Sequence, residues 1–271
     1  MSDRYCVIGN PIGHSRSPAI HAAFALQTGQ DLVYERCLAP LDGFAATVAG
    51  LVAAGVRGAN VTLPFKLDAA ALATTLSPRA QAAGAVNTLS FTDGLVHGDN
   101  TDGAGLVNDI TRNAGFGVKG KRVLLLGAGG AARGAILPLF GERPRELVIA
   151  NRTRASADAL VARFAAPGQL VSSCEFAELA GRFDLVINAT SASLSGALPP
   201  LPAWIFGPRT LALDMMYGNK PTLFMEFASG CGATVRDGLG MLVEQAAEAF
   251  TLWRGVRPDT TTILESMRST L

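Results

Sequence analysis

The chain has 271 residues, of which 49% are hydrophobic and 17% are charged, and 23 Lys and Arg against 22 Asp and Glu leave a formal net charge of +1. This composition excludes an intrinsically disordered chain, and the near-zero charge argues against a nucleic-acid or anionic-membrane partner. No apolar run reaches the roughly 18 residues of a membrane span, and the first residues lack the apolar segment of a signal peptide. We therefore expect a cytoplasmic protein without nucleic-acid or membrane partners.

The four cysteines are far apart in the chain and form neither a CxxC pair nor a cluster with histidine; they are Cys6, Cys37, Cys174 and Cys231. A disulfide framework or a zinc site is therefore not expected, and we predict no metal. Free cysteine is usually buried, so each is interpreted as a core residue. The 30 glycines exceed the average frequency of about 7%, and several of them lie in the motifs described below.

Short apolar strands alternate with helices along the chain. In the N-terminal part, strands are predicted at residues 5–9, 32–38 and 58–63, helices at 18–28, 41–54 and 68–76, and a hairpin at 86–91 and 95–98. A helix at 102–114 leads to strands at 121–127, 146–150, 170–174, 185–188 and 211–215, with helices at 131–140 and 154–164. A long helix is predicted at 240–254. This alternation predicts an α/β fold with mostly parallel sheets.

A glycine-rich segment, Gly-Ala-Gly-Gly-Ala-Ala at 127–132, follows a buried strand and opens a helix, as in the G-x-G-x-x-G/A fingerprint of dinucleotide sites. Its first glycine permits a tight turn, and its second lets the backbone approach the pyrophosphate. The helix N-terminus offers free N–H groups to the phosphates. We therefore predict a Rossmann domain with cofactor contacts at Gly127, Ala128, Gly129, Gly130 and Ala131.

The end of the next strand indicates which dinucleotide binds. NAD sites usually place Asp or Glu there, about 20 residues after the first glycine, to bind the ribose hydroxyls. Here the strand is followed by Asn151, Arg152, Thr153 and Arg154, without a carboxylate. The guanidinium of Arg152 suits a 2′-phosphate, and Asn151 and Thr153 can add hydrogen bonds, so the sequence predicts NADP. For Arg154, a cofactor contact and a solvated charge at the helix start are both open.

Polar residues also gather in the turns of the N-terminal part. Ser15 and Ser17 lie just before a predicted helix, where they could hold a carboxylate. Ser17 precedes Pro18, so its side chain also fits an N-cap of that helix. The other polar residues of this kind are Asn60, Thr62, Lys66, Asn87 and Asp102.

Together these motifs resemble the shikimate dehydrogenase family, and the resemblance covers essentially the whole chain. The motifs, in the family's order and spacing, are GNPIGHSRSP (9–18), NVTLPFK (60–66), AVNT (85–88), GDNTDG (98–103), GAGGAAR (127–133), NRT (151–153), NATS (188–191) and DGLGMLVEQAA (237–247). The resemblance implies a two-domain α/β fold with a cleft between the domains. A Rossmann NADP-binding domain would span 103–237, and a discontinuous substrate-binding domain would span 1–102 and 238–271.

The resemblance also implies an activity, the reversible NADP-dependent reduction of 3-dehydroshikimate to shikimate, with Lys66 and Asp102 as the catalytic pair. Ser15 and Ser17 would bind the substrate carboxylate. Residues expected to hydrogen-bond the ring hydroxyls or to hold the lysine are Asn60, Thr62, Asn87 and Gln245. Residues expected at the substrate side or near the cofactor are Tyr217, Thr190, Ser191 and Gly238. Because Gln245 would be needed at the substrate, helix 240–254 should pack on the N-terminal domain.

Two alternatives remain open: a quinate/shikimate dehydrogenase with relaxed cofactor use, and a non-catalytic relative that binds shikimate and NADP. Arg152 argues against a preference for NAD, and the presence of both Lys66 and Asp102 argues against a non-catalytic protein. Monomer and homodimer are both open. The family usually has proline two residues after the tyrosine at 217, where this chain has Asn219, which leaves the path of that loop and the role of Thr222 open.

Overall fold

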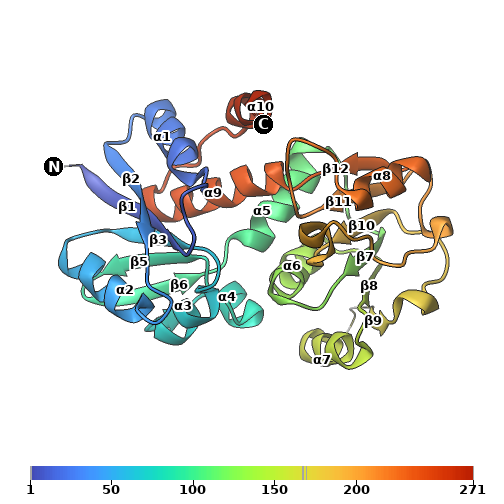
Figure 1. The fold of residues 1–271 in the computed structure, drawn as a ribbon. Coiled ribbons are helices and arrows are strands. Elements are labelled where there is room, and N and C mark those ends of the chain that lie inside the picture. Colours follow the sequence, from blue (N-terminus) through green and yellow to red (C-terminus); the bar gives the residue numbers. More distant parts are fainter. Residues whose placement is uncertain (1, 167, 169, 271) are drawn as a thin grey trace. The chain divides into compact units, whose positions relative to one another are not determined.

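The chain consists of two compact units. The computed structural model describes residues 2–166, 168 and 170–270. Met1–Gly105 and Val243–Met267 form the first unit, and Leu106–Leu242 and Arg268–Leu271 form the second. Each unit contains a six-stranded sheet with helices beside it (Figure 1). The expected domains at 1–102 with 238–271 and at 103–237 stay a prediction, and they include Met1, Pro167, Gln169 and Leu271, which lie outside the described residues.

The first unit has a mixed sheet with the strand order β2-β1-β3-β5-β6-β4. Its strands are β1 Asp3–Gly9, β2 Leu32–Leu38, β3 Gly58–Val61, β4 Thr75–Leu76, β5 Thr88–Thr92 and β6 Leu95–Asp99. β1 pairs in parallel with β2 and β3, whereas β5 runs antiparallel to β3 and β6. Its helices are α1 Ser17–Thr28, α2 Phe44–Ala53, α3 Lys66–Leu72 and α4 Pro78–Ala83. The predicted hairpin is confirmed as the β5–β6 pair.

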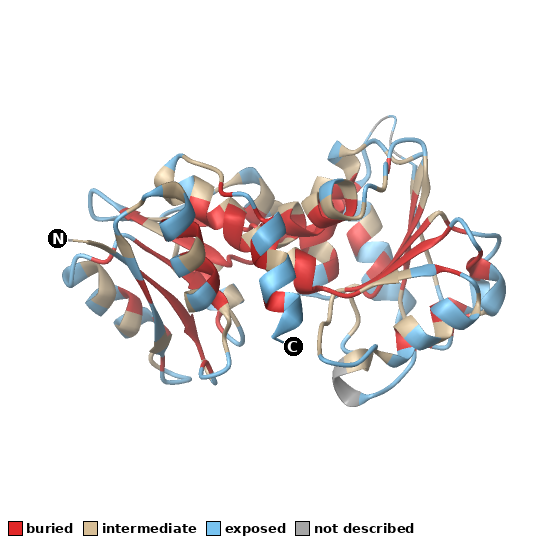
Figure 2. Ribbon diagram, turned by 90° about the horizontal axis from the view of Figure 1, so that it is seen from above, coloured by how far each residue is buried: buried red, intermediate tan, exposed pale blue. Residues whose placement is uncertain are grey.

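Burial on both faces explains why β1 is apolar along most of its length. Successive side chains of a strand point to opposite faces of the sheet. Cys6 and Ile8 belong to the core cluster on one face, and Tyr5 and Val7 pack with Tyr34 in the cluster on the other. Figure 2 shows buried residues along the strands of each sheet. A parallel strand covered on both faces needs such a continuous apolar run.

The second unit is a parallel sheet with the order β12-β11-β10-β7-β8-β9. Its strands are β7 Arg122–Leu126, β8 Glu146–Ala150, β9 Val171–Cys174, β10 Leu185–Asn188, β11 Leu211–Asp214 and β12 Thr234–Arg236. Counted within the unit, this is the Rossmann order 3-2-1-4-5-6, read from the far edge. The strand order reverses between β7 and β10, where such folds bind their ligands. The main helices are α6 Gly130–Gly141, α7 Arg154–Phe164 and α8 Leu223–Gly230.

Three further helices complete the chain. α5 Asp102–Asn108 continues as a π-helical turn at Asp109–Asn113, so the helix predicted at 102–114 changes its hydrogen-bond pattern half-way. α9 Leu239–Arg254 brings the chain back to the first unit, and α10 Thr261–Ser269 follows it. The indole N–H of Trp253 donates to the carbonyl oxygen of Leu89 at 3.1 Å. This contact and the assignment of Val243–Met267 to the first unit confirm that the long C-terminal helix packs there.

Two local predictions were wrong, and four short elements were missed. The helix expected at 68–76 begins at Lys66 and ends at Leu72, because Thr75 and Leu76 pair with β6 as an edge strand. Ser17 is not an N-cap: α1 begins at Ser17 itself, after Arg16, and no side chain caps it. α4, α8, α10 and β12 were not predicted.

Among the described residues, no helix is both long and apolar enough to cross a membrane. The same part of the chain contains no group of three or more His, Cys, Asp or Glu suited to a metal ion. Its four cysteines are free thiols; Cys6 is buried, and the other three are half-buried.

Candidate active site

Lys66 and Asp102 each begin a helix, and their side chains meet. Lys66 is the first residue of α3, and Asp102 is the first residue of α5. Lys66 Nζ donates to Asp102 Oδ2 at 2.6 Å, with the two side chains 31% and 18% exposed. A helix N-terminus favours a carboxylate and disfavours an ammonium group. The carboxylate therefore supplies the charge balance that the lysine lacks on its own helix.

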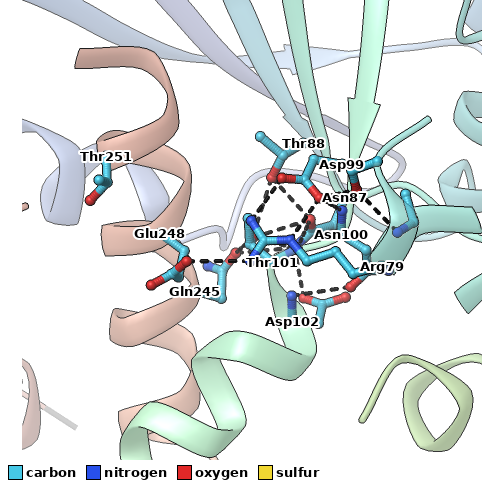
Figure 3. A network of polar contacts seen from close by, with 12 residues as sticks. Arg79, Asn87, Thr88, Asp99, Asn100, Thr101, Asp102, Gln245, Glu248 and Thr251 are labelled. Atoms are coloured by element: carbon cyan, nitrogen blue, oxygen red, sulfur yellow. Dashed lines mark hydrogen bonds and ion pairs between the residues drawn. The ribbon is translucent and has the colours of Figure 1, made fainter. Parts of the chain in front are cut away.

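The side-chain amide of Asn87 orients Asp102. Asn87 Nδ2 donates to Asp102 Oδ1 at 2.8 Å and to Gln245 Oε1 at 3.3 Å. Asn87 Oδ1 accepts the backbone N–H of Thr101 at 2.8 Å and the hydroxyl of Thr88 at 2.9 Å. Because donors already occupy the oxygen side of this amide, its nitrogen must face Asp102 (Figure 3). The other carboxylate oxygen is then left for the ammonium group.

Asn60 holds Asn87 and Thr88 in place through its side-chain amide. The hydroxyl of Tyr34 donates to Asn60 Oδ1 at 2.7 Å, and Asn60 Nδ2 donates to the carbonyl oxygen of Asn87 at 3.2 Å and to Thr88 Oγ1 at 3.1 Å. Burial raises the pKa of Tyr34 well above its ordinary value, so its hydroxyl is neutral and can donate. The polar atoms of Asn60 are thus engaged within the protein, and its contact with the substrate stays a prediction.

Ser15 and Thr62 lie in loops at the C-terminal edge of the β1 and β3 strands, and Ser17 is the first residue of α1. The hydroxyl of Ser15 accepts the backbone N–H of Ser17 at 3.3 Å, and Ser17 is buried. A Cβ atom at Gly9 would lie 2.6 Å from Thr62 Cγ2, so glycine lets the loop after β1 close on the loop after β3. Since β1 and β3 are parallel, this edge is also the one from which the chain continues to Lys66.

Arg79, on α4, links two elements that carry site residues. Its guanidinium contacts Asp99 through two bonds of 2.7 Å and reaches Glu248 at 3.4 Å (Figure 3). Asp99 ends β6, three residues before Asp102, and Glu248 lies about one turn after Gln245 on α9. The arginine therefore connects the turn before Asp102 to the helix that carries Gln245.

Sequence reasoning missed Arg79 because α4 was not predicted. The available signal was Ser77-Pro78, a serine and a proline in the positions that begin helices. Ser77 caps α4 by accepting the N–H of Ala80 at 3.2 Å, and its hydroxyl also donates to Asp99. Burial alone would raise the pKa of Asp99, but the hydrogen bonds from Arg79 and Ser77 outweigh it and hold that pKa below its ordinary value.

In the second unit, the loop between β7 and α6 has the shape of a phosphate cradle. Gly127 has a φ of +103°, a conformation that favours glycine, and a Cβ atom there would lie 3.2 Å from the carbonyl oxygen of Ala189. At Gly129 and Gly130 a Cβ atom would meet only open space. The open space adjoins the first turn of α6, which contains Ala131 and follows Ala128. This room beside free N–H groups fits the pyrophosphate of a dinucleotide.

The loop after β8 presents an exposed arginine. No hydrogen bond or ion pair within the described ranges involves the Arg152 side chain, so its guanidinium is available. Next to it, Asn151 Nδ2 donates to the carbonyl oxygen of Thr153 at 3.0 Å. Arg154, in contrast, pairs with Glu178 at 2.6 and 2.9 Å. Of the two arginines, Arg152 is the one free to take a 2′-phosphate.

The loops after β10 and β11 carry the remaining predicted cofactor and substrate residues. Thr190 and Ser191 follow β10, and the half-buried Tyr217 follows β11. The N–H of Gly238 donates to the carbonyl oxygen of Met216 at 3.0 Å, and a Cβ atom there would collide with the backbone of residue 215. The close backbone packing explains glycine at 238, and its cofactor contact stays a prediction.

Three family models match the chain. The model described as the shikimate dehydrogenase substrate binding domain matches residues 7–89, the one described as shikimate / quinate 5-dehydrogenase matches 109–195, and the shikimate 5'-dehydrogenase C-terminal domain matches 238–268. A curated relative, the shikimate dehydrogenase (NADP(+)) of Herminiimonas arsenicoxydans, is 62% identical over 271 residues, covering 100% of this chain and 99% of that one.

The chain belongs to the shikimate dehydrogenase family. Among solved structures, an Ael1 enzyme from Pseudomonas putida is 48% identical, with a TM-score of 0.95 and 98% of both chains covered. Shikimate 5-dehydrogenase from Thermus thermophilus, solved in complex with NADP(H) and shikimate, is 35% identical, with a TM-score of 0.88, and the match covers 99% of this chain and 100% of that one. The predicted two-sheet α/β fold with a Rossmann unit is thus confirmed.

Proposed function

We propose that this member of the shikimate dehydrogenase family catalyses the reversible NADP-dependent reduction of 3-dehydroshikimate to shikimate. The observation that carries the proposal is the 2.6 Å contact between Lys66 and Asp102, oriented by Asn87, in a chain that matches the family over its length. The reaction would serve the shikimate pathway to chorismate and the aromatic amino acids, in the cytoplasm. A monomer or a homodimer is proposed, and light scattering during gel filtration distinguishes them.

Reduction of the carbonyl group requires one proton in addition to the hydride, and Lys66 and Asp102 would transfer this proton. NADPH, when bound, supplies the hydride that reduces the carbonyl carbon. The carbonyl oxygen then develops the charge of an alkoxide, which needs a proton or a positive charge within hydrogen-bond reach. The ammonium group of Lys66 can provide both. Asp102 accepts from Lys66 and can accept from the substrate hydroxyl as well, so it would align the two groups.

The remaining polar residues of the first unit would hold the substrate. Ser15 and Ser17 are proposed to bind its carboxylate from the turn that leads into α1. Thr62, Gln245 and Asn60 are proposed to contact the ring hydroxyls or to hold the lysine, and Tyr217 is proposed to line the substrate side. The hydrogen bond that Gln245 Oε1 accepts from the Asn87 amide, which also donates to Asp102, supports this proposal for Gln245.

The cofactor would be held by the loops that follow the strands of the Rossmann sheet. Gly127 to Ala131 are proposed to contact the pyrophosphate, and Asn151, Arg152 and Thr153 the 2′-phosphate. Thr190, Ser191 and Gly238 are proposed to lie near the nicotinamide half. The open space at Gly129 and Gly130 and the unpaired guanidinium among the described residues support NADP as the cofactor.

A single assay distinguishes the proposed shikimate dehydrogenase from the two alternative functions. Oxidation of shikimate and of quinate is followed by the absorbance of the reduced cofactor, with NADP⁺ and with NAD⁺. The proposal predicts the highest kcat/KM for shikimate with NADP⁺. Comparable values with quinate and NAD⁺ would instead support the relaxed quinate/shikimate alternative. Binding of shikimate and NADP⁺ without any reduction would indicate a non-catalytic relative.

A further inference from the structure

Asp214 is a fully buried carboxylate at the C-terminal edge of the Rossmann sheet. It ends β11, is 0% exposed, and is paired in register with Asn188, the last residue of β10. No role was assigned to it from the sequence. Both strands end where the chain turns into loops that carry residues proposed for the cofactor and the substrate.

Four neutral donors surround this carboxylate. Asp214 Oδ2 accepts from Asn188 Nδ2 at 3.1 Å, from the hydroxyl of Ser193 at 2.6 Å and from the hydroxyl of Thr222 at 2.7 Å. Asp214 Oδ1 accepts the backbone N–H of Met216 at 3.0 Å. Burying a carboxylate is costly unless hydrogen bonds satisfy it, and these four bonds do so without a cation.

The donors come from three different segments. Ser193 lies in the turn after β10, Met216 in the loop after β11, and Thr222 at the N-terminus of α8. Thr222 is also the N-cap of α8, because its hydroxyl accepts the N–H of Met225 at 3.3 Å. This settles the role of Thr222 and shows that the loop around Tyr217 is held at both ends by one carboxylate.

The carboxylate also sets the direction of the neighbouring hydrogen bonds. An ionised carboxylate only accepts, so the amide of Asn188 must turn its nitrogen toward Asp214. Asn188 Oδ1 then faces Thr190, accepting its backbone N–H at 3.2 Å and its hydroxyl at 2.7 Å. The Thr190 hydroxyl in turn accepts the N–H of Ala192 at 3.4 Å. The hydrogen bonds of Asp214 and Asn188 therefore hold the conformation of the Thr190–Ser191 turn.

We propose that Asp214 is a positioning residue for the nicotinamide half of the cofactor site, acting through Thr190 and through the loop that carries Tyr217. The inference rests on the proposed function, since that function places those residues at the nicotinamide. The adenosine half has a separate anchor in the loop after β8, and the bonds described for Asp214 do not reach that loop. The two halves of the cofactor should therefore respond differently to a change at Asp214.

The test measures the affinity of the purified full chain for NADP⁺ and for 2′,5′-ADP, the fragment without nicotinamide, by titration calorimetry. Asp214→Asn keeps the shape of the side chain and replaces an acceptor oxygen by a donor. We expect NADP⁺ to bind about tenfold more weakly, which corresponds to about 1.4 kcal/mol, while 2′,5′-ADP keeps its affinity within about twofold. Ser193→Ala, which removes one donor, should shift the same ratio less and serves if Asp214→Asn does not fold.

Thr210→Val is the matched control. Thr210 is buried directly before β11, at the opposite end of the strand, and its hydroxyl donates to the carbonyl oxygen of Phe183 at 2.7 Å. The variant also loses one buried hydrogen bond, so it should lower the melting temperature without changing the ratio of the two affinities. The proposal is overturned if both ligands weaken together in Asp214→Asn, if neither does, or if Thr210→Val shifts the ratio equally. Failure of the wild-type chain to bind either ligand would refute the proposed function instead.

Discussion

His21 is a base without a polar partner in the core of the first unit. Its ring stacks on Tyr34 at 4.1 Å between centroids, and Phe24, Phe250 and Trp253 surround it. Burial lowers its pKa to about 3. The nearby amide of Asn60 opposes this shift, although neither ring nitrogen has a partner within hydrogen-bond geometry among the described residues. The folded chain therefore keeps this imidazole neutral at physiological pH.

Stability should fall as the pH drops below 6.5, the ordinary pKa of histidine. Between pH 6.5 and about 3, His21 is protonated in the unfolded chain but stays neutral in the folded chain. The free energy of unfolding should decrease by about 1.4 kcal/mol per pH unit from this group. Urea unfolding between about pH 7 and 5 measures it, and His21→Phe should show a flatter dependence. Equal pH dependence in the two proteins would contradict this account.

We expect Arg79 to affect catalysis, although it is distant in sequence from Lys66 and Asp102. Arg79→Met leaves Asp99 without its ion-pair partner and releases the turn that leads to Asp102. We expect kcat/KM for shikimate to fall about tenfold, since a displacement of the aligning carboxylate is felt in the transition state. Steady-state kinetics at saturating NADP⁺ measures it, and Arg79→Lys should restore part of the activity.

Arg257→Met provides the control for Arg79. Arg257 pairs with the same Glu248 and also with Glu244 at 2.6 Å, but it does not contact Asp99. Both variants should lower the melting temperature, because each removes the arginine that pairs with a buried carboxylate. Only Arg79→Met should reduce kcat/KM. A similar loss in both variants would show that the effect is one of stability alone.

At the scale of elements, α5 and α9 lie in direct contact at one glycine. A Cβ atom at Gly105 would lie 2.6 Å from the backbone nitrogen and the Cβ atom of Gln245. Both residues belong to the first unit, close to Asp102 and Asn87. The absence of a side chain at Gly105 therefore allows Gln245 to lie close to Asn87 and Asp102.

Gly105→Ala should separate the two helices and draw Gln245 away from Asn87. Alanine forms helices better than glycine by about 1 kcal/mol, so a loss of stability and of kcat/KM in this variant must come from the steric contact. Gly50→Ala, inside α2 with open space around it, should stabilise the chain slightly and leave the kinetics unchanged. Steady-state kinetics and thermal melting of both variants test this steric effect. Unchanged kinetics in Gly105→Ala would refute it.

Several elements could be predicted to the residue from the sequence, and the shortest ones could not. β2, β8, α7 and β10 have the predicted limits. The edge strand β4 has two residues, and α4 has six, too few for any periodicity to appear. Ser17 illustrates a different limit, because serine before proline fits either the N-cap or the first helical turn, and only packing decides. The π-helical turn after α5 has no local signal either.

For the site, too, some features could be predicted from the sequence and others could not. The motifs predicted that Lys66, Asp102, Asn87 and Gln245 would gather, and their hydrogen bonds confirm that they do. The direction of each bond was not predictable, because it depends on buried neighbours such as Thr88 that no motif singles out. Arg79 was missed because α4 was not predicted, and Asp214 because its hydrogen-bond partners are distant in sequence and lie in no motif that points to it.

At the scale of the whole molecule, the chain leaves the first unit within α5 and returns to it within α9. The unit boundaries fall between Gly105 and Leu106 and between Leu242 and Val243. The Rossmann sheet is thus inserted into a chain whose two outer parts form the unit that contains Lys66 and Asp102. The family resemblance implied a discontinuous domain of this kind, with the glycine-rich loop between the motifs of Lys66 and Gln245, and the expected domain limits stay a prediction.

The turnover of Lys66→Ala at saturating shikimate and NADP⁺ tests the central claim most directly. If Lys66 donates and accepts the proton, kcat should fall by a factor of about 10² to 10⁴. NADP⁺ binding should be unchanged, because the cofactor loops belong to the other unit. Turnover close to that of the wild-type chain would contradict the account.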